Sequence, residues 1–91
     1  MFKLPIITVV GKDGKGIIAA VSAKCAEVGA NIVEISQSVL KDYFAMIMLA
    51  DISSLSIPFS EFVDLLSEYG NSKNLQIQTM HEDIFNAMHT I

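Results

Sequence analysis

The stretch Gly11-Lys12-Asp13-Gly14-Lys15-Gly16 separates an apolar, β-branched run, Ile6 to Val10, from a helical pattern, Ile17 to Val28. Three glycines in six residues allow a tight turn and a close approach of the backbone to a neighbouring group. If a helix begins at the end of this loop, its first N–H groups are unpaired and can hold a carboxylate or a phosphate. The junction is therefore either an ordinary turn or a binding site for an anionic group.

On both sides of this loop, the spacing of apolar residues predicts four strands and two helices. Strands are indicated where β-branched residues cluster or alternate, and helices where apolar residues recur every three or four positions. Gly29 and Gly70 are the expected helix stops, and Pro58 suits a first helical turn. The predicted elements are strands 6–10, 32–40, 43–51 and 75–80 and helices 17–28 and 58–70.

The second predicted strand alternates strictly along its length. One face should carry Val33, Ile35, Gln37 and Val39, and the other should carry Ile32, Glu34, Ser36, Ser38 and Leu40. A glutamine on an apolar face is costly unless it is hydrogen-bonded, so Gln37 is either a satisfied polar group at an interface or a ligand contact. The polar pair Lys41-Asp42 predicts a tight hairpin into the third strand.

The order of these elements, β-α-β-β-α-β, predicts an α+β fold of the ferredoxin-like type. Right-handed crossovers place the first and third strands in the middle of a four-stranded antiparallel sheet, with both helices on one face. Residues 1–81 form this domain, and residues 82–91 have the apolar spacing of a short C-terminal helix. The open sheet face, with Val, Ile and Met side chains, is expected to be covered by a second copy or by the tail.

Composition narrows the classes of function. The 91 residues suffice for one domain, 52% of them are hydrophobic, and the net charge is −4 with no arginine. Bidentate phosphate and base contacts favour arginine, so nucleic acid is not an expected partner. No run is long enough to span a membrane and no signal peptide is evident, which together predict a cytoplasmic protein. The single Cys25 lies on the apolar stripe of the first helix and should behave as a small hydrophobe.

The sequence indicates neither a catalytic nor a metal site. Metal carriers of this fold need two cysteines in the first βα loop, and acylphosphatases need an arginine there. In RNA-recognition modules the stacking aromatics share one face of a strand, whereas Tyr43 and Phe44 are adjacent and should face opposite sides. His81 and His89 are interpreted as solvated tail residues. No nucleophile–base arrangement is present, so no enzyme activity and no cofactor are expected.

The sequence resembles the ACT domain, a small-molecule-sensing module of amino-acid metabolism. The resemblance spans nearly the whole chain and depends on the strand Ile6–Val10, the loop Gly11–Gly16 with the aliphatic residues after it, and Gly29-Ala30-Asn31-Ile32. More narrowly, it is similar to a family of uncharacterised stand-alone prokaryotic ACT proteins related to glycine-cleavage repressor-like regulators. Many ACT domains have proline before the last loop glycine, where this chain has Lys15.

The resemblance implies a homodimer that holds an amino acid or another small effector between the first βα loop of one subunit and the second strand of its neighbour. The implied ligand-binding residues are Gly11, Lys12, Asp13, Gly14, Lys15, Gly16, Ile17, Asn31 and Ile32. Backbone N–H groups would hold the ligand carboxylate, the two lysines would add positive charge, and Asp13 or Asn31 would accept from the ammonium. Asp13 is alternatively a turn cap and Asn31 a turn former.

Two functions follow as hypotheses. The first is a regulatory sensor that binds an amino acid and passes this state to a partner enzyme or regulator. The second is a protein–protein adaptor without a ligand, which docks through the open sheet face or the C-terminal helix.

Overall fold

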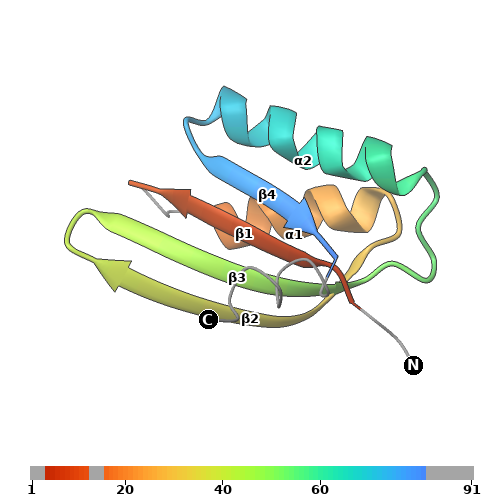
Figure 1. Ribbon diagram of the computed structural model, residues 1–91, viewed down its shortest axis with the longest axis horizontal. Coiled ribbons are helices and arrows are strands. Elements are labelled where there is room, and N and C mark those ends of the chain that lie inside the picture. Colours follow the sequence, from red (N-terminus) through yellow and green to blue (C-terminus); the bar gives the residue numbers. More distant parts are fainter. Residues whose placement is uncertain (1–3, 13–15, 82–91) are drawn as a thin grey trace.

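The computed structural model describes residues 4–12 and 16–81, and these form a four-stranded sheet with two helices on one face (Figure 1). The helices are α1 (Ile17–Glu27) and α2 (Phe59–Ser72). The strands are β1 (Ile6–Gly11), β2 (Asn31–Leu40), β3 (Tyr43–Asp51) and β4 (Gln76–Met80). The predicted α+β ferredoxin-like fold is confirmed. The predicted tail helix, residues 82–91, lies outside the described residues.

The sheet order is β2-β3-β1-β4, and all neighbouring strands are antiparallel. Strands β1 and β3 occupy the middle, as the crossover rule predicts. The register places Gly11 opposite Phe44 and Ile6 opposite Leu49. The hairpin turn Lys41-Asp42 therefore lies at the same end of the sheet as the loop that leaves β1.

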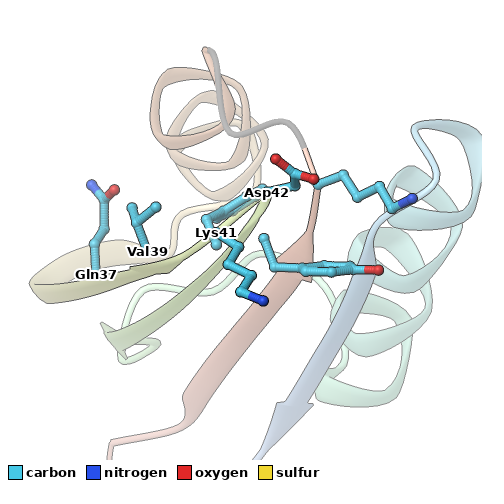
Figure 2. Close-up of a pocket in the computed structure, with 7 residues that line it drawn as sticks. Gln37, Val39, Lys41 and Asp42 are labelled. Carbon is cyan, nitrogen blue, oxygen red and sulfur yellow. The ribbon is translucent and has the colours of Figure 1, made fainter.

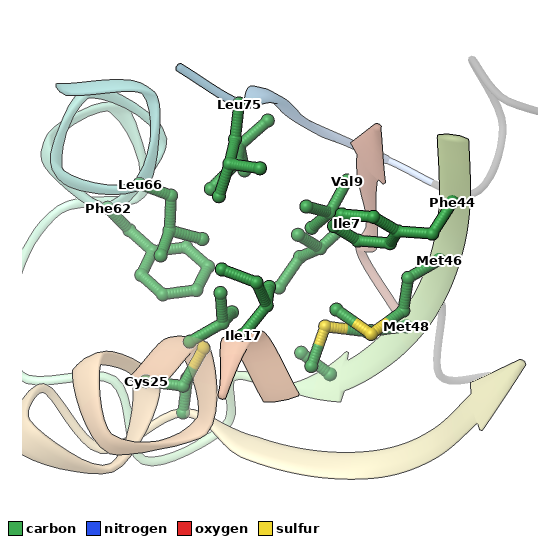
Figure 3. Close-up of a cluster of buried hydrophobic side chains, with 14 residues drawn as sticks. Ile7, Val9, Ile17, Cys25, Phe44, Met46, Met48, Phe62, Leu66 and Leu75 are labelled. Carbon is green, nitrogen blue, oxygen red and sulfur yellow. The ribbon is translucent and has the colours of Figure 1, made fainter. Parts of the chain in front are cut away.

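The core fills the space between the sheet and the helices (Figure 3). Alternate residues of the two central strands, Ile7 and Val9 with Met46 and Met48, are almost completely buried there. Helix α1 contributes Ile17, Val21 and Cys25, and α2 contributes Phe62 and Leu66. Cys25 has no exposed surface, which confirms that it packs as a small hydrophobe.

The opposite sheet face carries Val, Ile and Met side chains, as expected, with Met80 as its methionine. Its exposed large side chains are Val10, Tyr43 and Ile47, whereas Met46 and Met48 of the same β3 strand point into the core. Phe44 is buried and Tyr43 is half exposed, so the two adjacent aromatic residues do face opposite sides. The predicted orientation of this aromatic pair is therefore confirmed.

Helix α1 ends as predicted, through Gly29. This glycine has φ 85°, and the N–H groups of Gly29 and Ala30 bond to the carbonyls of Ala26 and Cys25 at 3.2 and 2.8 Å. These two bonds are the pair that closes a helix with a left-handed residue after its cap. A Cβ on Gly29 would overlap the backbone carbonyl oxygen of Ser54, so no larger residue fits there without a shift.

The prediction that α2 stops at Gly70 is wrong. The helix continues to Ser72, and Asn74, with φ 58°, supplies the left-handed residue after the cap Lys73. The Leu75 N–H group returns to the Gly70 carbonyl at 2.8 Å. A Cβ on Gly70 would lie only 2.9 Å from the Leu75 carbonyl oxygen. Glycine is thus needed because the chain entering β4 passes close to the helix, which no local pattern reveals.

The strict alternation predicted for β2 is also wrong. Val33 is the extra residue of a β-bulge, because Ile32 lies opposite Ala50 and Glu34 lies opposite the adjacent Leu49. Residues directly opposite each other share a face, so Ile32 and Ile35 both lie on the helix side. The bulge lets Ile32 reach the core.

Within the described residues, no helix is long and apolar enough to cross a membrane.

Candidate functional site

The loop end of the sheet contains four of the residues implied as ligand contacts. Gly11 is the last residue of β1, where a Cβ would overlap the Leu75 side chain and lie 3.3 Å from Phe44 Cε1. Packing alone therefore explains this glycine. Lys12 follows it, and its Nζ atom lies 5.6 Å from the centre of the Tyr43 ring, within cation–π range.

Gly16 and Ile17 form the start of α1. Gly16 is the N-cap with φ 72°, and its carbonyl accepts the first helical bond from Ala20 at 3.0 Å. Among the described residues, chain neighbours aside, no heavy atom lies within 4 Å of a Cβ built on Gly16, so they leave the space above it open. Ile17 is buried and fixes this end of the helix in the core.

The N-terminus of α1 has the electrostatic character of an anion site. No side chain among the described residues caps the helix, and the first turn contains no acidic residue. The first N–H groups and the positive end of the helix dipole are therefore not neutralised by a carboxylate within the turn. Asp13, Gly14 and Lys15, three further implied contacts, lie outside the described residues.

Asn31 and Ile32 lie at the other end of the sheet. They begin β2 opposite Asp51 and Ala50, whereas Gly11 lies opposite Phe44. Seven residue steps along β3 lead from Phe44 to Asp51, about 23 Å at 3.3 Å per residue. The structure therefore does not bring Asn31 and Ile32 to the loop within one chain. Asn31 is exposed, and Ile32 packs partly against the core.

Near Asn31, at the end of the sheet where β2 begins, polar and aromatic side chains contact other residues of the same chain. The Ser53 N–H group donates to Asp51 Oδ1 at 2.9 Å, and this hydrogen bond holds the pKa of Asp51 below its usual value. The exposed His81, which follows β4, has its ring 4.9 Å from that of Phe59. Among the described residues, no cluster of His, Cys, Asp or Glu has the arrangement of a metal site.

A hollow of about 570 Å³ lies at the loop end, around the β2–β3 hairpin (Figure 2). Gln37 and Val39 extend side by side from β2, and the lining includes two lysines and one aspartate. Its lining residues are Lys12, Gln37, Val39, Lys41, Asp42, Tyr43 and Phe44. A smaller hollow of about 280 Å³ lies on the other side of the same aromatic pair, against Val10 and Ala45.

The sequence interpretation found only two residues of the large hollow. It included Lys12 in the loop and named Gln37 as an interface group or ligand contact, but it assigned no binding role to the hairpin residues. The sequence contained the information needed to find these hairpin residues, because the predicted antiparallel pairing of the first and third strands places the turn Lys41-Asp42 beside the loop. Lysine ammonium groups next to apolar and aromatic surface are suited to a small organic anion.

Comparison with known proteins connects this arrangement to a family. The ACT domain family matches residues 4–79. A UPF0237 protein of Listeria innocua is 43% identical over 86 residues, which cover 94% of this chain and 97% of that protein. UPF0237 proteins of Clostridium perfringens and Methanococcus maripaludis are each 46% identical over 94% of this chain and cover 97% and 96% of their own lengths.

Comparison with solved structures supports the same family assignment. An ACT domain protein from Streptococcus pneumoniae superposes with a TM-score of 0.78 at 37% identity, over 100% of this chain and 99% of that one. A formyltetrahydrofolate deformylase from Pseudomonas syringae also gives 0.78, at 17% identity, and the match covers 89% of this chain but 28% of that enzyme, so the likeness shows the shared fold alone. By the family match and these relatives, this chain belongs to the ACT domain family.

Proposed function

We propose that this protein is a homodimeric regulatory sensor for an amino acid. ACT domains are in general small-molecule-binding regulatory modules, and their ligands are often amino acids. The observation that carries the proposal is the uncapped start of α1, where Gly16 leaves open space beside the first helical turn. A ligand carboxylate at this position receives backbone N–H groups and the positive end of the helix dipole.

The charge around this position favours an anion. Lys12 places an ammonium group at the rim of the adjoining hollow, and Lys41 places a second one there. The pair supplies long-range attraction for a carboxylate, and the Gln37 amide offers both a donor and an acceptor. In the same proposal Asp13, Gly14 and Lys15 complete the loop around the ligand.

The second half of the site comes from a neighbouring copy. Asn31 is exposed at the far end of the sheet, about 23 Å from the loop of its own chain by the strand rise. Its amide oxygen can accept a hydrogen bond from the ligand ammonium only if a second chain brings it to the loop. One chain thus has both half-sites, and two chains form two complete sites. The regulated partner is an enzyme or regulator in the same cytoplasm.

A thermal-shift screen with the twenty amino acids tests this function. A ligand that binds the native protein raises the melting temperature by mass action. The shift by the best ligand should be reduced in Lys12→Ala and in Asn31→Ala. It should be unchanged in Lys73→Ala and Asn71→Ala, which alter the same residue types outside the implied ligand contacts. An unchanged shift in the first two variants, or the absence of any shift, would overturn the proposal.

The alternative, an adaptor without a ligand, is favoured by one observation. Val10, Tyr43 and Ile47 are 40–51% exposed on the sheet face opposite the helices, which is the composition of a docking surface. An adaptor predicts that no amino acid stabilises the protein and that Ile47→Ser weakens complex formation with its partner. A ligand-induced shift that survives Ile47→Ser contradicts the adaptor and supports the sensor.

A further inference from the structure

The sheet face opposite the helices is covered at one end and open at the other. Alternate residues of β1 lie on this face, and Ile6 at the start of the strand is 4% exposed, whereas Val10 near its end is 44% exposed. Ile6 does not belong to the cluster of buried side chains between the sheet and the helices. Helices α1 and α2 both lie on the other face (Figure 1), so neither of them covers Ile6.

The strand partners of Ile6 show that the covered end is a row across three strands. Ile6 lies opposite Met80 of β4 on one side and opposite Leu49 of β3 on the other. Residues directly opposite each other share a face, so all three point away from the helices, and Met80 and Leu49 are half-buried. Two positions further along the same face, Gln78 and Ile47 are exposed. The cover therefore runs across the strands and not along them.

The chain leaves the sheet at this same row. Strand β4 ends at Met80, and the next residue, His81, has its ring 4.9 Å from that of Phe59 at the start of α2. This contact holds the departing chain at the edge of the sheet. Residues 82–91 follow His81 and lie outside the described part of the chain. They start beside one end of the covered row.

We infer that residues 82–91 dock across this row and form a third layer of the fold, on the sheet face opposite α1 and α2. A helix of ten residues is about 15 Å long, and the three strand spacings from β4 to β2 add up to about 14 Å, so the segment is long enough to cross the sheet. Its large apolar residues have the spacing of one helical face, and they are Ile84, Phe85, Met88 and Ile91. Burial of this face against Met80, Ile6 and Leu49 supplies the apolar gain.

Two other occupants fit the row less well. Residues 1–3 also lie outside the described part of the chain, but they contain only two large apolar side chains, Met1 and Phe2, against four in the C-terminal segment. A second copy is not required, because the 4% exposure of Ile6 is that of a single chain. The C-terminal segment is therefore the occupant that the burial pattern favours.

Docking of this segment divides the sheet face into two parts. Val10, Tyr43 and Ile47 stay exposed toward the loop end, whereas the Ile6 end is occupied by the chain itself. A protein partner can meet the first part directly, but it must displace residues 82–91 to reach the second. The covered row lies at the end of the sheet away from the β1–α1 loop, so the inference does not depend on ligand binding there.

Thiol reactivity in the full chain tests the docking. Ile6→Cys should react with a disulfide reagent far more slowly than Val10→Cys, which lies on the same strand and face, and the buried Cys25 adds no background. Met88→Lys places an ammonium group in the apolar contact and should raise the Ile6→Cys rate toward that of Val10→Cys. Asn86→Lys introduces the same residue on the opposite side of the predicted helix and should leave the Ile6→Cys rate unchanged. A rate that Met88→Lys does not raise would overturn the inference.

The same assay identifies either of the other occupants. If Phe2→Lys raises the Ile6→Cys rate and Met88→Lys does not, residues 1–3 form the cover. If protection of Ile6→Cys is lost on dilution of the protein, a second copy forms it. The docked segment predicts that Phe2→Lys has no effect and that protection is independent of concentration, so either contrary result would overturn it.

A double-mutant cycle tests the contact without thiol chemistry. At about 1.5 Å per residue Met88 falls roughly 9 Å along the segment, close to β3 at two strand spacings from β4, so Leu49 is its expected neighbour. In urea titrations the losses from Leu49→Ala and Met88→Ala should sum to more than the loss of the double variant, because each removes part of one contact. Val10→Ala and Met88→Ala should be additive, because Val10 lies at the open end. Additive losses for Leu49→Ala and Met88→Ala would contradict the docking.

Discussion

At the scale of single residues, two glycines with positive φ have different surroundings. Gly16 and Gly29 have φ values of 72° and 85°, but only Gly29 faces a backbone carbonyl where a Cβ would stand. We expect Gly16→Ala to lower the free energy of unfolding by about 1–2 kcal/mol, the usual cost of a left-handed alanine. Gly29→Ala should cost clearly more, because the Ser54 carbonyl must also move. Urea titration of both variants checks the order, and equal losses would contradict the crowding at Gly29.

At the same scale, the buried thiol of Cys25 leads to a prediction of how the stability of the fold depends on pH. Burial raises the pKa of its thiol to about 11, so the folded protein holds this proton at a pH where the unfolded chain releases it. The stability it contributes is therefore present below about pH 9 and is lost as the pH rises toward 11. At pH 8 the thiol should react with a disulfide reagent only after denaturant is added. Rapid reaction of the native protein would mean that Cys25 is accessible.

At the scale of elements, a substitution at Gly70, near the end of α2, tests two explanations for the glycine at this position. If helix propensity alone acted at Gly70, which lies inside α2, Gly70→Ala would be stabilising, because alanine is the better helix former by about 1 kcal/mol. The structure instead predicts a loss of about 1–3 kcal/mol, because the added methyl group would press on the Leu75 carbonyl and Ile77. Asn74→Gly, at the left-handed position after the cap, should be neutral or slightly stabilising. Chemical denaturation of the two variants distinguishes these explanations.

The bulge in β2 makes a second prediction at this scale. Deletion of Val33 removes the extra residue and leaves Ile32 and Glu34 opposite the same partners, so the fold should be retained. Deletion of Ile47 from the central β3 would turn the residues on one side of it to the wrong face and should abolish cooperative unfolding. Circular dichroism with thermal melts compares the two deletions. Loss of the fold on deletion of Val33 would show that the bulge is essential.

These elements also show what the sequence could and could not predict. Local signals were sufficient for the element order, the Lys41-Asp42 turn and the end of α1 at Gly29, because turn residues and apolar spacing act over a few positions. The bulge at Val33 depends on pairing with β3, and the end of α2 depends on its packing against the chain that enters β4, and both predictions failed. For the site, the loop and helix start were predicted, but the hollow at the hairpin forms only when β1 and β3 pair.

At the scale of the whole molecule, the question is which surface another copy covers. Two surfaces expose apolar side chains: the edge of β2, with Val39 at 72%, and the face opposite the helices, with Val10 at 44%. In the proposed sensor the two half-sites lie at opposite ends of one chain, so they have to come from two copies. The surface through which the copies meet would then couple assembly to ligand binding.

This choice predicts how the melting temperature depends on protein concentration. A dimer that dissociates on unfolding gains stability by mass action, by roughly 4 °C for each tenfold increase in concentration for two chains of this size. Val39→Lys places an ammonium group on the exposed edge of β2 and should remove most of this dependence if the copies meet there. Val10→Lys, the same change on the open face, should preserve it. If Val10→Lys abolished the dependence and Val39→Lys did not, the copies would meet through the open face instead of the β2 edge.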